Sequence, residues 1–65
     1  MLQNHIYNLM AQMVEENKSL WRIKNKYLAD STDCPECQLF FNKLAEKKEA
    51  TINELLMLIK SEINK

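Results

Sequence analysis

Asp30-Ser31-Thr32-Asp33-Cys34-Pro35 is the one turn-like stretch of this 65-residue chain, and it contains the only proline. The chain has no glycine, and good helix formers without an internal breaker flank this stretch on both sides. We therefore expect helices over about residues 2–29 and about 35–63, joined by a turn over about 30–34. Because the connection is short, the helices must run antiparallel. The predicted fold is an all-α helical hairpin, a single domain over residues 1–65.

The composition excludes several classes of protein. Nine basic and nine acidic side chains cancel, and a chain without glycine lacks the means to build phosphate-binding loops. With a single histidine and no nucleotide loop, we expect no enzyme, no catalytic residue and no cofactor. The longest apolar run, Leu55 to Ile59, is too short to span a membrane. Residues 1–5 lack the pattern of a signal peptide, so we expect a cytoplasmic protein.

Apolar residues recur at heptad spacing along both predicted helices. In the first helix they are Leu2, Ile6, Leu9, Met13, Leu20, Ile23 and Tyr27, and a second line of Met10, Val14, Trp21 and Leu28 widens the stripe. In the second helix they are Cys37, Phe41, Leu44, Thr51, Leu55 and Leu58, flanked by Phe40, Ile52, Ile59 and Ile63.

Stripes this wide need more than one partner helix. We therefore expect two hairpins to form a homodimeric four-helix bundle, with a different protein as the alternative partner. The side chains expected to pack in the core or the dimer are Leu9, Met13, Leu20, Trp21, Ile23, Tyr27, Phe41, Leu44, Leu55 and Ile59.

The start of the second helix carries a capping pattern. Asp33 is expected to cap it, with Glu36 reaching back and Pro35 in the first turn. The two cysteines, Cys34 and Cys37, occupy the same first turn. We expect them to be structural, without a standing disulfide in a cytosolic setting. Redox-labile thiols and a metal site shared between two chains are the alternatives.

Each heptad seam is interrupted once by a charge, at Glu16 and at Lys48. Antiparallel pairing brings these two residues level, so we expect a polar pair that sets the register of the bundle. The alternatives are a metal site and simple exposure to solvent. We expect no metal, and the side chains that would hold one otherwise are Cys34, Cys37 and Glu16.

Lys18, Arg22 and Lys26 share one helix face, with Lys24 nearby. Such a stripe can bind phosphates. With zero net charge, however, we interpret it as a solvated face and expect no nucleic-acid partner. The lone histidine, His5, is assigned to the surface or to packing at the bundle end.

Several motifs resemble half of a ferritin-like or rubrerythrin-like four-helix bundle. They are Leu20-Trp21, Tyr27, Asp30, Cys37, Phe40-Phe41, Leu44-Ala45-Glu46-Lys47-Lys48-Glu49 and Glu54-Leu55. The resemblance implies a bundle that binds iron, with Glu16 near a carboxylate ligand of the first helix. Lys48 and Thr51 stand where that family has its Glu-x-x-His pair.

The sequence therefore predicts a small, non-catalytic interaction or structural module that acts as a homodimer. One alternative is a ferritin-like metal-binding protein. The other is an RNA- or DNA-binding dimer, because the hairpin plan is also similar to a plasmid copy-control family that binds paired RNA loops.

Overall fold

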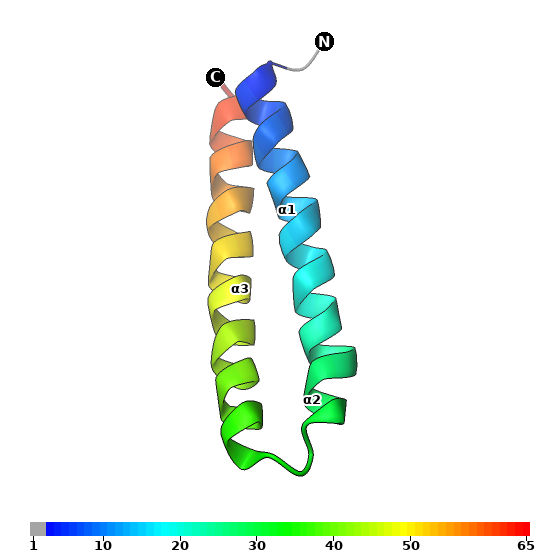
Figure 1. The fold of residues 1–65 in the computed structure, drawn as a ribbon. Helices are drawn as coiled ribbons and strands as arrows, with labels where there is room; N and C mark the ends of the chain where they lie inside the picture. The colour runs from blue at the N-terminus through cyan, green and yellow to red at the C-terminus, as the bar shows by residue number, and fades with distance from the viewer. Residues whose placement is uncertain (1–2) are drawn as a thin grey trace.

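A computed structural model describes residues 3–65, so Leu2 of the predicted apolar line lies outside the described part of the chain. The elements are α1 (Asn4–Arg22), a π-helical turn η1 (Ile23–Tyr27), a short α2 (Leu28–Asp30) and α3 (Pro35–Ile63). The first three are continuous and form one long helix, which runs antiparallel to α3 (Figure 1). The structure is thus all-helical over the described residues, as predicted, and measures 48 × 17 × 12 Å.

The turn ends at a helix cap that differs from the expected one. Cys34, not Asp33, precedes α3 in an extended conformation, and its Sγ accepts a hydrogen bond from the Cys37 backbone N–H. Pro35 occupies the first turn, where its missing N–H costs nothing. Because α3 starts directly at Pro35, Asp33 lies one residue too early to act as the cap. Across the turn, Gln38 donates to the Leu28 carbonyl at 3.3 Å and ties α3 to α2.

The first helix faces α3 with its heptad line. Ile6 and Ile23 are buried, and Leu9, Met13, Glu16 and Leu20 are half-buried between them. Ile23 is the most enclosed side chain of the described residues, at 1% exposure. This line forms the seam of the hairpin without any help from a second chain.

The inward line of α3 departs from the heptad pattern after Lys48. Thr51 and Leu58 are exposed, and the inward positions are taken by Ile52, Leu55 and Ile59. A straight α-helix drifts by about 20° per heptad against a strict seven-residue repeat. The step from Lys48 to Ile52 is therefore four residues, and the predicted residues Thr51 and Leu58 turn away from the seam.

The π turn η1 was not predicted from the sequence. Its defining hydrogen bond runs from the Leu28 N–H to the Ile23 carbonyl, which fits one extra residue into the turn. Leu28 is consequently half-buried, and Tyr27 moves to the edge of the seam at 37% exposure. There the Tyr27 ring lies 5.3 Å from the Phe41 ring, so the predicted packing partner still contacts α3.

Candidate functional site

Glu16 and Lys48 form an ion pair between the two helices. Lys48 Nζ lies 2.8 Å from Glu16 Oε2, and the side chains are 26% and 13% exposed respectively. Gln12 donates to the other carboxylate oxygen, Glu16 Oε1, at 3.1 Å. The lysine hydrogen bond lowers the pKa of Glu16 below its ordinary value, although partial burial opposes the effect. The carboxylate is thus held ionised, with a partner on each oxygen.

This polar layer does not fit the pair of iron ions that the ferritin-like resemblance implies. Lys48 places an ammonium against the Glu16 carboxylate, and Thr51 is exposed. Within residues 3–65, no three His, Cys, Asp or Glu side chains gather as metal ligands. The arrangement acts as a register contact between helices.

Cys34 and Cys37 are joined by a disulfide, contrary to the sequence-based expectation of separate thiols. The reason is local geometry. Three residues apart across the first turn of α3, their Cα atoms lie 5.2 Å apart, within the range that a disulfide bridges. Both residues are half-buried at the turn of the hairpin. The bond therefore closes the first helical turn and engages two of the candidate metal ligands.

The basic stripe is an exposed helix face. Lys18, Arg22 and Lys26 are all exposed, and Lys18 lies 3.9 Å from Glu15 one turn away. Lys24 points elsewhere, toward α3, where its Nζ lies 2.6 Å from Glu49 Oε1. His5 contacts Glu62 Oε1 at 2.8 Å at the open end of the hairpin.

Two of these contacts define the two sides of the hairpin. Helical spacing places Lys24 and Glu49 on one side of the seam, and His5 and Glu62 on the other. The Lys24–Glu49 side carries two lines of residues at spacings of mostly three and four. The first helix contributes Tyr7, Met10, Val14, Asn17, Trp21 and Lys24, and α3 contributes Gln38, Asn42, Ala45, Glu49, Ile52, Leu56 and Ile63. We call this surface the shared face.

The shared face exposes large apolar side chains that the hairpin does not cover. Trp21 is 63% exposed although the sequence predicted it as a packing residue, so it is not part of the hairpin core. Tyr7 and Val14 on the first helix, and Leu56 and Ile63 on α3, are also exposed. Leu39, Phe40, Met57 and Leu58 are exposed as well, outside the shared face.

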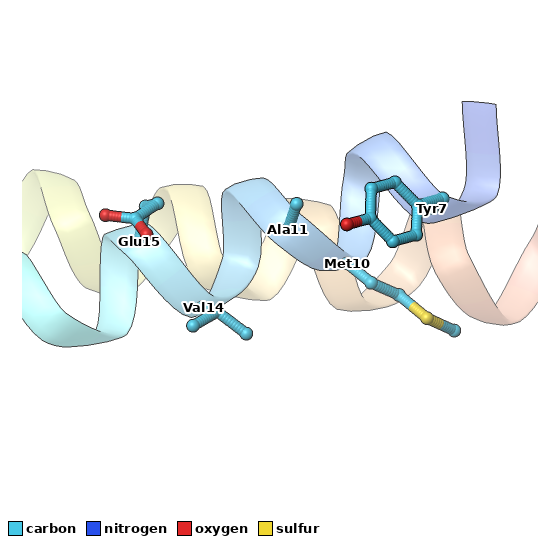
Figure 2. A pocket seen from close by; sticks show the side chains of 5 residues that line it. All are labelled: Tyr7, Met10, Ala11, Val14 and Glu15. Atoms are coloured by element: carbon cyan, nitrogen blue, oxygen red, sulfur yellow. The ribbon is translucent and has the colours of Figure 1, made fainter. Parts of the chain in front are cut away.

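A surface hollow lies on the side of α1 that faces away from α3 (Figure 2). It has a volume of about 390 Å³ and is lined by Tyr7, Met10, Ala11, Val14 and Glu15, all from α1. The methyl group of Ala11 is small beside its neighbours, which creates the depression. Tyr7, Met10, Ala11 and Val14 follow the i, i+3, i+4, i+7 pattern. Four residues so spaced form the hole that accepts one side chain in knobs-into-holes helix packing.

No protein-family model, no curated protein and no solved structure matches this chain. Within residues 3–65, no helix is both long enough and apolar enough to cross a lipid bilayer. The functional conclusion below therefore depends on the shared face itself.

Proposed function

We propose that this chain is a non-catalytic interaction module that acts as a homodimer, with two hairpins packed into a four-helix bundle. The observation that carries the proposal is the exposed apolar line on the shared face, which includes Trp21 at 63% exposure. The seam of a single hairpin is already complete without these residues. A second layer of helices would remove them from water.

A second copy is a better occupant than an unrelated protein because the face is complementary to itself. It carries one cation and one anion, Lys24 and Glu49, whose charges cancel, and it exposes Tyr7, Val14 and Trp21 for a second copy to cover. A two-fold axis presents each feature of this surface to the other copy, as in most homodimers.

The test is the melting temperature across a hundredfold dilution. A dimer that folds with its partner loses stability on dilution, whereas a folded monomer does not. We expect Val14→Lys, at the centre of the shared face, to lower the melting temperature and to abolish its dependence on concentration. Met57→Lys is the matched control, because Met57 is exposed on the outer side of α3. A wild-type melting temperature unchanged by dilution would contradict the homodimer.

A further inference from the structure

We infer that Cys34 and Cys37 form a redox-active pair that exchanges reversibly with disulfides and thiols of low molecular weight, with Cys34 as the reacting sulfur. Their disulfide lies at the turn between α2 and α3 (Figure 1). They are the only two cysteines of the chain, so no third thiol competes for the bond. This reaction goes beyond the proposed interaction module and does not depend on its dimer.

The disulfide contributes little to holding the hairpin together. A disulfide stabilises a fold chiefly by constraining the loop that it closes in the unfolded chain, and the effect grows with the length of that loop. Cys34 and Cys37 are only three residues apart. The Gln38 side chain, which donates to the Leu28 carbonyl at 3.3 Å, links α3 to α2 across the turn without the bond. The bond can therefore open while the hairpin remains folded.

The backbone holds the two cysteines in place independently of the disulfide. The Cys34 N–H donates to the Ser31 carbonyl at 3.0 Å, and the Cys34 carbonyl accepts from the Gln38 N–H at 3.0 Å. Cys37 is fixed by the first turn of α3. The two Cα atoms lie 5.2 Å apart, a distance at which a disulfide forms without movement of the backbone. A reduced pair held in this way can close again, which makes the bond reversible.

Cys34 is the sulfur at which negative charge is better stabilised. It directly precedes α3, and its Sγ accepts a hydrogen bond from the Cys37 backbone N–H at 3.1 Å. A thiolate at this position keeps that hydrogen bond and also interacts with the partial positive charge of the helix N-terminus. Because the thiolate is the form that attacks a disulfide, Cys34 is the attacking sulfur of the reduced pair.

The surroundings of the pair define the class of substrate. Cys34 and Cys37 are half-buried, whereas their neighbours Asp33, Pro35 and Glu36 are exposed, so a small molecule can approach the sulfurs. The carboxylates of Asp33 and Glu36 repel an anionic disulfide and do not repel an uncharged or cationic one. The substrate class is therefore an uncharged or cationic disulfide of low molecular weight.

The exchange consists of two steps that balance. The Cys34 thiolate attacks one sulfur of the external disulfide, which forms a mixed disulfide and releases the other half as a thiolate. Cys37 then loses its proton to water, and its thiolate attacks Cys34 Sγ, which closes the Cys34–Cys37 bond and releases the second half. The two cysteines are oxidised by two electrons, and the external disulfide is reduced to two thiols. An excess of external thiol drives the same steps in reverse.

The reaction of the reduced protein with hydroxyethyl disulfide, an uncharged probe, tests the inference. Mass spectrometry at neutral pH follows the mixed disulfide and its closure in the wild type, and the rate of modification in Cys37→Ala and in Cys34→Ala. The matched control is Asn64→Cys with Cys34→Ser and Cys37→Ala, which places an ordinary thiol at the exposed end of α3. Brief alkylation of the reduced wild type with iodoacetamide, followed by peptide mapping, identifies the more reactive cysteine without any substitution.

We expect the wild type to close its disulfide with release of both halves of the probe, and an excess of mercaptoethanol to open it again. We expect Cys37→Ala to react about tenfold faster than Cys34→Ala and than the control, and iodoacetamide to label Cys34 first. Equal rates in the three variants, or first labelling of Cys37, would overturn the assignment of Cys34. A wild type that stops at the mixed disulfide would overturn the reversible pair.

Discussion

Lys48 of α3 lies 2.8 Å from Glu16 of α1, and both charges interrupt an apolar seam at the same level. A partly buried ion pair in such a position contributes little net stability, because desolvation offsets the attraction between the charges. It does penalise every register that separates the partners. The pair therefore fixes how far one helix slides along the other, and with it the levels of Trp21 and Ala45 on the shared face.

The first prediction concerns the loss of one partner of this pair. Lys48→Leu leaves the Glu16 carboxylate half-buried with only Gln12 as a partner, at an expected cost of about 2 kcal/mol in the free energy of unfolding. Adding Glu16→Leu removes the stranded charge and should recover most of that loss. Urea unfolding of the wild type and the three variants measures the coupling. Additive effects of the two substitutions would show that the charges do not interact.

The second prediction is a pH dependence that involves Glu16. The folded-state pKa of Glu16 lies below its ordinary value of 4.5. The ion pair therefore contributes its full stability above pH 4.5, and the contribution is lost as the pH falls through the lowered folded-state pKa. Glu16→Gln should flatten the decline in the free energy of unfolding below that pH. In Glu16→Gln, part of the remaining decline of the free energy of unfolding at low pH comes from Glu62, whose pKa is lowered chiefly by Lys65. An unchanged slope in Glu16→Gln would contradict the pairing.

The third prediction concerns charge reversal on the shared face. Lys24→Glu makes both of its charges negative, and Glu49→Lys makes both positive, so each variant alone should self-associate about tenfold more weakly, or about 1.4 kcal/mol. An equimolar mixture of the two should regain the wild-type affinity as a heterodimer. Lys18→Glu is the matched control, because Lys18 lies on the exposed outer side of α1 and is paired with Glu15. Sedimentation velocity measures the association of Lys24→Glu alone, of Glu49→Lys alone and of their equimolar mixture. A mixture no tighter than its components would exclude these charges from the interface.

The fourth prediction is that the Cys34–Cys37 disulfide is dispensable for the fold. It closes a loop of only four residues, for which chain entropy gives at most about 2 kcal/mol. Reduction with dithiothreitol should lower the melting temperature while the helix content and the association remain. Circular dichroism before and after reduction measures this, with thiol counting to show that reduction is complete. Unfolding on reduction would show that the bond holds the turn together.

The sequence predicts the helices well, since residues 30–35 form the one turn-like stretch and long runs of helix formers flank it. This pattern is compatible only with two helices joined by a turn. It also places Glu16 level with Lys48, because antiparallel pairing about a known turn has a single register. The π turn at Ile23–Tyr27 carries no signal in the sequence, because its residues are also compatible with an ordinary α-helix. The exposed positions of Thr51 and Leu58 follow from helical drift, which a strict heptad count omits.

The shared face was visible in the sequence only in part. Met10, Val14 and Trp21 stand out as a second apolar line of the first helix. The matching line of α3 is hidden, because Ala45 and Glu49 do not read as an apolar pattern. Only the Lys24–Glu49 contact shows that the two lines lie on one side of the seam.

The mass of the wild-type protein by sedimentation equilibrium at micromolar concentration tests the homodimer most directly. We expect a mass of twice the 7.7 kDa chain, returning to one chain in Val14→Lys and remaining doubled in Met57→Lys. A wild-type mass of 7.7 kDa would contradict the proposal that a second copy covers the shared face.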